Sequence, residues 1–185
     1  MSKGKLFVVS GASGVGKSTV LKKVMAARDD LLFSVSATTR PVRNDDIPGV
    51  TYEFITEECF DEMVRNDEFV EYDRHAKASY GTPRRQLEEK LAVANVILDV
   101  EPNGAFAVRK NCPDATLIFI MPPSEEILEY RLRNRNNTSE EQILIRLERA
   151  KWEMAQRFEY DHVVVNDDLD TCVNEILKLI AEKAD

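Results

Sequence analysis

One segment of the sequence has the residue types and spacing of a phosphate cradle: Gly-Ala-Ser-Gly-Val-Gly-Lys-Ser at residues 11–18. It fits the pattern G-x-x-x-x-G-K-[ST], follows a short apolar run and precedes a helical pattern. Glycines let the backbone curl so that successive N–H groups face one concavity, and the helix adds its positive N-terminal end. Lys17 can reach the β- and γ-phosphates of ATP, and the Ser18 hydroxyl can ligate Mg²⁺. We therefore predict a P-loop with these contact residues: Gly11, Ala12, Ser13, Gly14, Val15, Gly16, Lys17, Ser18 and Thr19.

The P-loop identifies a phosphate donor but leaves the acceptor open, because ATPases, GTPases and small-molecule kinases share it. A GTPase normally carries an Asn-Lys-x-Asp segment that reads guanine, and this sequence has none.

A second candidate region is rich in arginine. Five arginines lie close together in the sequence: Arg131, Arg133, Arg135, Arg146 and Arg149. Arg131 and Arg135 are four residues apart and would share one face of a helix. Arginines can stabilise the charge that develops on a phosphoryl group during transfer. The alternative interpretation is a solvated helix face with local ion pairs.

Further segments, in order along the chain, resemble the guanylate kinase family. Ser-Val-Ser-Ala-Thr-Thr-Arg-Pro-Val-Arg at residues 34–43 is similar to the family's GMP-binding signature and continues into Gly-Val-Thr-Tyr-Glu-Phe at 49–54. Glu71 and the Tyr-Gly-Thr at 80–82 match its acidic guanine reader and its Tyr-Gly-Thr/Ser turn. Pro-Pro-Ser at 122–124, Arg-Leu-Arg-Asn-Arg at 131–135, Arg-Leu at 146–147 and Asn-Asp-Asp-Leu at 166–169 follow. The resemblance covers nearly the whole chain.

The resemblance implies Mg²⁺-dependent transfer of the ATP γ-phosphoryl group to GMP, and to dGMP, as part of purine nucleotide metabolism. It implies that the GMP phosphate is held by Arg40, Arg43, Tyr52 and Tyr80. It also implies that the transferring group is stabilised by Lys17, Arg43, Arg135 and Arg146. Arg131 would lie near the donor phosphates, and Asn166 and Asp167 near the adenine.

Three residues of the segments that resemble the family, Glu71, Ser36 and Thr82, have side chains that can recognise guanine. Guanine offers N1–H and the N2 amino group as donors, and a carboxylate such as Glu71 can accept from both. Hydroxyls of Ser36 and Thr82 can satisfy O6 or neighbouring groups. Adenine would leave the buried carboxylate facing the wrong edge, so AMP should be rejected.

The sequence departs from the family pattern in two places. Asp45-Asp46 replaces the usual Gly-Glu, so the glutamate is shortened to Asp46. Glu-Pro-Asn-Gly at residues 101–104 replaces Asp-x-Gln-Gly. Asp99 is retained at the end of a strand, and Asp99 and Glu101 are expected to contact guanine or the waters of Mg²⁺.

Buried strands alternate with helical patterns, which favours a parallel sheet covered on both faces. We predict strands at residues 6–9, 33–36, 95–100, 116–121 and 162–165. We predict helices at 18–27, 56–65, 83–94 and 169–184, with two more capped by Ser124 and by Thr138 or Ser139. The fold class is α/β, a P-loop NTPase-type parallel sheet flanked by helices, with an inserted GMP-binding subdomain at about 34–83 and a helical lid at about 124–146. The core comprises about 1–33, 84–123 and 147–185.

Composition fits one ordinary globular domain of 185 residues. The net charge of −8 argues against nucleic acid or anionic membrane as partners. Three scattered cysteines show no metal-ligand spacing, and no signal peptide is evident, so a cytoplasmic location is expected.

Two other functions remain open at this stage. Guanylate-kinase-like domains in scaffolding proteins bind peptides without catalysis, but they generally lose parts of the P-loop that are intact here. A P-loop kinase for another small phosphate is the second alternative, and Glu71 with Ser36 and Thr82 argues against it.

Overall fold

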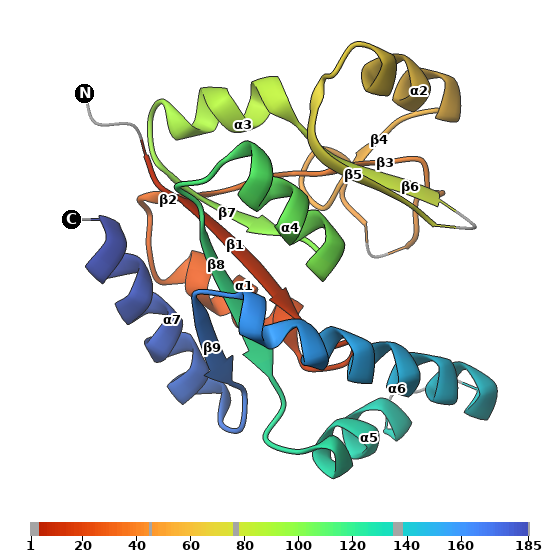
Figure 1. Ribbon diagram of the computed structural model, residues 1–185, viewed down its shortest axis with the longest axis vertical. Coiled ribbons are helices and arrows are strands. Elements are labelled where there is room, and N and C mark those ends of the chain that lie inside the picture. The colour runs from red at the N-terminus through yellow and green to blue at the C-terminus, as the bar shows by residue number, and fades with distance from the viewer. Residues whose placement is uncertain (1–3, 45, 76–77, 135–138, 185) are drawn as a thin grey trace. The chain divides into compact units, whose positions relative to one another are not determined.

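The computed structural model describes residues 4–44, 46–75, 78–134 and 139–184. Helices and strands alternate along most of the chain (Figure 1). In chain order the elements are β1 (Leu6–Gly11), α1 (Lys17–Ala26), β2 (Leu31–Phe33), β3 (Ala37–Thr38), β4 (Glu53–Phe54), α2 (Glu57–Arg65), β5 (Phe69–His75), β6 (Ala78–Pro83), α3 (Arg84–Leu91), β7 (Asn95–Asp99), α4 (Pro102–Asn111), β8 (Thr116–Met121), α5 (Glu125–Arg133), α6 (Glu140–Ala155), a 3₁₀ turn (Gln156–Glu159), β9 (His162–Val165) and α7 (Leu169–Ala184).

The main sheet has five strands in the order β2-β7-β1-β8-β9. The outer pairs β2–β7 and β8–β9 are parallel. The central strands are continuous apolar runs that are buried almost completely, as expected for a parallel sheet covered by helices. This confirms the predicted α/β fold of the P-loop NTPase type.

The chain forms two compact units, of which the first combines Met1–Val8 with Asp30–Ala115. This unit contains a second sheet, in the order β4-β3-β6-β5. Strands β5 and β6 form an antiparallel hairpin that runs side by side in Figure 1. Helix α2 packs Phe60 against Phe69 of β5, with ring centroids 4.6 Å apart. The small apolar cluster around Ala37, Phe60 and Phe69 gives this sheet a core of its own.

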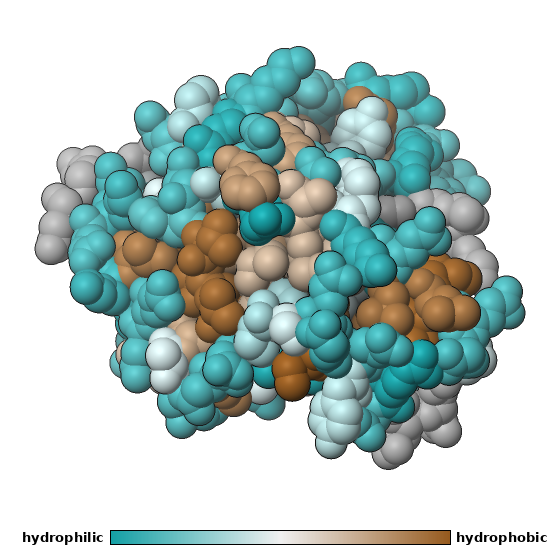
Figure 2. Space-filling model, turned by 60° about the horizontal axis from the view of Figure 1, so that its bottom comes forward, coloured by the Kyte–Doolittle hydropathy of each residue, from teal (hydrophilic) through white to brown (hydrophobic). Residues whose placement is uncertain are grey.

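The second unit combines Val9–Asp29 with Thr116–Asp185, and in it α1 packs against α7. Side-chain caps begin two of its helices: Ser124 accepts from the Ile127 N–H, and Ser139 accepts from the Gln142 N–H. Both caps confirm predictions. Large apolar side chains remain exposed on α5 and α6, including Tyr130. Figure 2 shows brown hydrophobic patches set in a mostly hydrophilic surface.

Three features differ from the sequence prediction. The strand expected at 33–36 ends at Phe33, because after the bond from the Ser34 N–H to the Ile97 carbonyl the chain leaves the main sheet for β3. The β5–β6 hairpin was not predicted as strands, since its residues alternate little in polarity. Helix α4 was missed because Pro102 and Gly104 in its first turn suggest a loop.

None of the helices within the described residues is long and apolar enough to cross a membrane.

Candidate active site

The P-loop connects β1 to α1, as the motif predicts, and two of its glycines have positive φ. Gly14 has φ 91° and Gly16, which is the N-cap of α1, has φ 97°. A Cβ at Gly14 would lie 2.5 Å from Cδ2 of Leu132, and one at Gly16 would lie 2.9 Å from Nδ2 of Asn166. Both backbone conformation and space therefore require glycine at these positions.

Two predicted nucleotide-contact residues hold the backbone of this loop. The Asn166 side chain, which is buried, donates from Nδ2 to the Val15 carbonyl at 2.7 Å. The Arg131 guanidinium donates to the Asn166 carbonyl at 2.9 Å and, at 3.4 Å each, to the carbonyls of Val15 and Asp167. The P-loop, the end of β9 and helix α5 are thereby joined through one guanidinium.

Helix α6 holds the opposite part of the loop at Ser13. Glu153 accepts the Ser13 backbone N–H at 2.7 Å, and Arg146 donates from Nε to the Ser13 Oγ at 3.3 Å. Arg149 donates from Nε to the other oxygen of Glu153 at 3.1 Å. Arg146, Arg149 and Glu153 lie at positions i, i+3 and i+7, so they share one face of the helix.

The first turn of α1 carries the remaining donor-side residues. Lys17 is half-buried at the first position of the helix, and Ser18 and Thr19 are exposed beside it. A hydroxyl at this position suits Mg²⁺, which keeps several waters and takes few protein ligands besides the phosphates. We call the P-loop with its supports Arg131, Arg146, Glu153 and Asn166 the donor half; it lies entirely in the second unit.

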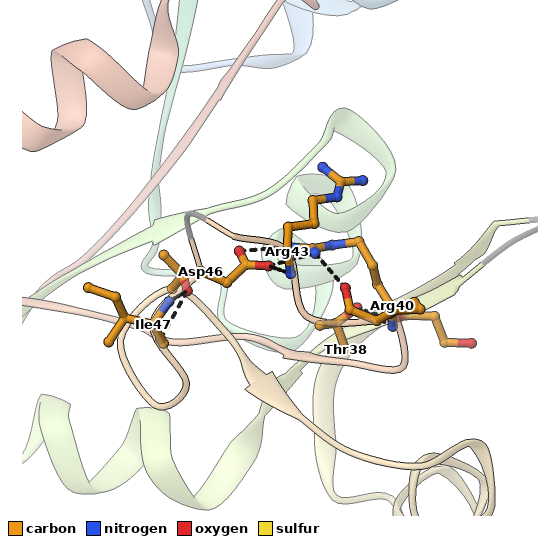
Figure 3. Close-up of polar contacts among 8 residues, drawn as sticks. Thr38, Arg40, Arg43, Asp46 and Ile47 are labelled. Atoms are coloured by element: carbon orange, nitrogen blue, oxygen red, sulfur yellow. Dashed lines mark hydrogen bonds and ion pairs between the residues drawn. The ribbon is translucent and has the colours of Figure 1, made fainter.

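In the first unit, residues predicted to hold the GMP phosphate cluster around Arg40. The Arg40 guanidinium makes two parallel bonds to the Asp46 carboxylate, at 2.8 and 3.0 Å, and both side chains are about nine-tenths buried (Figure 3). Asp46 also accepts the Arg43 backbone N–H at 2.6 Å. The Arg40 bonds, followed by the bond from Arg43, hold the pKa of Asp46 down at about 2. Asp46 is thus the carboxylate that orients Arg40.

Two aromatic rings complete this cluster. Arg40 lies over the Tyr52 ring, 5.2 Å from its centroid, and the rings of Tyr52 and Tyr80 meet edge to face at 5.8 Å. Burial raises the pKa of Tyr52, and the neighbouring charge of Asp99 raises it further. The hydroxyl of Tyr52 therefore stays protonated and can donate to a phosphate oxygen.

Two of the residues predicted to read the base meet across the β5–β6 hairpin. Glu71 pairs with Thr82 in the strand register, and the Thr82 hydroxyl donates to Oε1 of Glu71 at 2.5 Å. Burial raises the pKa of Glu71 to about 7, against the lowering effect of the Thr82 bond. Helix α4 approaches closely: a Cβ at Gly104 would lie 2.8 Å from Oε2 of Glu71.

We call this set the acceptor half: the Arg40–Asp46 cluster with Tyr52, Tyr80 and Asp99, and the Glu71–Thr82 pair with Gly104 and Glu101. It lies entirely in the first unit.

Not every predicted residue joins these clusters. The Arg43 side chain is exposed and, in Figure 3, its guanidinium points away from Asp46. Ser36 is buried directly before β3, with its carbonyl accepting the Glu53 N–H. Asp167 is exposed after β9, and Arg135 lies outside the described residues.

Sequence reasoning gave no role to Glu153 of the donor half or to Phe54, which lies beside the acceptor half. Glu153 lies between apolar residues of a helix, where an acid is usually solvated, and only its position seven residues after Arg146 could have suggested a shared face. Phe54 packs against Arg40, with the guanidinium 5.4 Å from its centroid.

Comparison with known proteins agrees with this arrangement. The family model described as guanylate kinase matches residues 3–183. A guanylate kinase from Carboxydothermus hydrogenoformans is 44% identical, with 99% of this chain and 91% of that protein covered. One from Thermus thermophilus is 44% identical, with 96% and 81% covered. The crystal structure of guanylate kinase from Anaplasma phagocytophilum superposes with a TM-score of 0.81 at 30% identity, covering 99% of this chain and 87% of that one. The P-loop, the paired Glu71 and Thr82 and these matches along the whole chain lead to one conclusion: the chain belongs to the guanylate kinase family.

Proposed function

We propose that this protein transfers the γ-phosphoryl group of ATP, bound as its Mg²⁺ complex, to the phosphate of GMP, giving ADP and GDP. The observation that carries the proposal is the buried Glu71 carboxylate, paired with Thr82 in the same unit as the Arg40–Tyr52–Tyr80 cluster. A base reader and a phosphate cluster together suit a purine nucleoside monophosphate.

The donor half binds the triphosphate. Backbone N–H groups of the P-loop and the N-terminus of α1 offer positive charge to its oxygens, and Lys17 reaches the β- and γ-phosphates. Ser18 would hold Mg²⁺, which neutralises charge on the bridging phosphates when bound. Arg131 acts through the backbone of Val15 and Asn166, so its role is to keep the loop in shape.

The acceptor half binds GMP. Glu71 accepts from N1–H and N2–H of guanine, with Thr82 and Ser36 supplying hydroxyls. The phosphate is held by Arg40, Tyr52 and Tyr80, with Arg43 swinging in from its exposed position. Asp99 and Glu101 supply further negative charge in this unit and would contact guanine or the waters of a bound Mg²⁺.

In the reaction, a phosphate oxygen of GMP attacks the γ-phosphorus, and the bond from that phosphorus to the bridging oxygen of ADP breaks. The acceptor is already an anion, so no general base is required. Lys17, Arg43, Arg135 and Arg146 stabilise the charge on the transferring group, as arginines do in other phosphoryl transfers.

We further propose that residues of about 34–83 act as a GMP-binding subdomain and about 124–146 as a lid, the rest forming the core. Closure of such parts would exclude water, which competes with GMP as acceptor. The three cysteines are free thiols, which suits the reducing cytoplasm where we place the enzyme.

The test is a coupled assay of ADP release with ATP and Mg²⁺, comparing GMP, dGMP, AMP, CMP, UMP and dTMP as acceptors. We expect turnover with GMP and dGMP alone. No turnover with any acceptor, in protein shown to be folded and to bind ATP, would refute the proposed reaction; equal turnover with AMP would refute the role of Glu71.

A further inference from the structure

The structure assigns a positioning role to Glu153: through the Ser13 N–H it sets the shape of the P-loop for the triphosphate. The residue lies on α6, far from the P-loop in sequence, and no motif includes it. The inference concerns ATP binding and rests on the proposed function only in its kinetic readout.

Burial is the first observation. Glu153 is 2% exposed, and its neighbours Ala150 and Met154 on the same face are also buried. A carboxylate in such a place is costly unless its oxygens are bonded and its charge is compensated. Both oxygens are used: Oε2 accepts the Ser13 N–H at 2.7 Å and Oε1 accepts from Arg149 at 3.1 Å.

The partner of Glu153 is the second observation. Ser13 is the third residue of the P-loop motif, and Glu153 bonds its backbone N–H. Since the peptide N–H of Ser13 is fixed toward α6, the following residues up to Ser18 must carry the contacts with phosphate. The orientation of that one peptide therefore constrains how the glycine turn at Gly14 and Gly16 begins.

Two further anchors explain why one carboxylate has a large effect. Arg146 holds the Ser13 hydroxyl, and Asn166 holds the Val15 carbonyl on the other side of Gly14. Gly14 has no side chain and a positive φ, so the segment between these anchors has little stiffness of its own. Releasing the Ser13 N–H would let the loop relax away from the shape that binds phosphate.

Charge is not the feature that the role requires. A negative group close to a triphosphate opposes binding, and Arg149 offsets it here. What matters is an acceptor atom at the right reach. Two substitutions separate these properties. Glu153→Gln keeps an acceptor for the Ser13 N–H but loses the charge and the bond from Arg149, whose half-exposed side chain can turn to solvent. Glu153→Asp keeps the charge and is one methylene too short.

The experiment measures the ATP dissociation constant by calorimetry without GMP, and then KM for ATP and for GMP. Glu148, exposed on the same helix, supplies the control Glu148→Asp. Loss of a charge-assisted hydrogen bond predicts roughly ten-fold weaker ATP binding for Glu153→Asp. We expect the KM for GMP to stay within about two-fold, and Glu153→Gln and Glu148→Asp to resemble the wild type, because both keep the bond to Ser13.

Three outcomes would overturn the role. These are unchanged ATP binding in folded Glu153→Asp, equal losses for ATP and GMP, and a loss in Glu153→Gln as large as that in Glu153→Asp. If the Asp variant does not fold, weakened ATP binding in folded Glu153→Gln still refutes the role. Failure of the proposed function would appear separately, as absent GMP turnover in the wild type that still binds ATP.

Discussion

The donor and acceptor halves are built in different ways. The donor half is made largely of backbone, shaped by Gly14 and Gly16 and held by Asn166, Arg131 and Glu153. The acceptor half is made of side chains that are already paired with one another, Arg40 with Asp46 and Glu71 with Thr82. ATP would therefore meet a loop whose groups are preorganised, whereas GMP would have to share or replace existing partners.

Because the two halves are built differently, they should respond differently to substitution. Damage to the donor half should act on phosphoryl transfer as a whole, and damage to the acceptor half should act on GMP alone.

The largest expected effect comes from the donor half. Lys17→Ala should reduce kcat/KM by about a thousand-fold, because the loop loses the ammonium charge that follows the transferring phosphate. Circular dichroism should show an intact fold, and Lys22→Ala, exposed on α1, serves as the control. Turnover retained in the Lys17 variant would contradict the assignment of the P-loop.

Glu71→Ala tests the acceptor half. If Glu71 reads two donors of the base, as we propose, its loss should raise the KM for GMP about a hundred-fold. The KM for ATP should change by less than about three-fold, since the donor half is untouched. Steady-state kinetics with Glu62→Gln, exposed on α2, as control would check this. Equal changes for both nucleotides would show that Glu71 does not read the base.

Asp46→Ala tests whether the ion pair between Asp46 and Arg40 strengthens or weakens GMP binding. We expect the KM for GMP to rise roughly ten-fold, because Arg40 loses the bidentate partner that orients it. A lower KM would show instead that Asp46 competes with the substrate phosphate. Asp46→Glu, which restores the family's longer side chain, should stay within about three-fold of the wild type.

The raised pKa of Glu71 predicts a pH effect on the acceptor half. Guanine donors favour the carboxylate, so protonation of Glu71 below about 7 should weaken GMP binding. Between about pH 8 and about pH 6 we expect the KM for GMP to rise roughly ten-fold beyond any change in Glu71→Gln. The GMP phosphate also titrates in this range, and it does so equally with both proteins, so comparison with Glu71→Gln removes its contribution. Identical pH profiles of KM for the two proteins would refute the prediction.

The raised pKa of Glu71 also makes the stability of the protein depend on pH. Folding raises the pKa of Glu71 from its ordinary value of 4.5 to about 7, so the free protein loses stability as the pH rises through this window. Thermal melts of Glu71→Gln should therefore gain on the wild type from about pH 5 to about pH 8. A difference in melting temperature that does not grow with pH would count against the buried carboxylate.

The smallest effect is expected at Gly104. Gly104→Ala would place a methyl group 2.8 Å from Oε2 of Glu71, and the carboxylate or α4 must shift. We expect the KM for GMP to rise about five-fold with the KM for ATP unchanged. Gly49→Ala, where a Cβ meets nothing within 4 Å but φ is positive, gives the comparison for backbone strain alone. If both variants behave alike, the contact with Glu71 is not the cause.

Local sequence patterns were enough to predict the parts of this protein that depend on neighbours along the chain. The P-loop, the apolar strands β1, β7, β8 and β9, and the caps Ser124 and Ser139 follow from local conformation and short-range patterns. The family resemblance added the acceptor residues Arg40, Tyr52, Glu71, Tyr80 and Thr82, although the hairpin that pairs Glu71 with Thr82 was not recognised.

Bonds between groups that are far apart in the sequence could be identified only in the folded structure. Glu153 is 140 residues from Ser13, and Asn166 is 151 residues from Val15, yet each holds the P-loop. Gly104 approaches Glu71 from α4, a helix that was not predicted because Pro102 and Gly104 in its first turn are typical of loops. Such pairs show no pattern in the local sequence, because their distances and geometry depend on how the folded elements pack together.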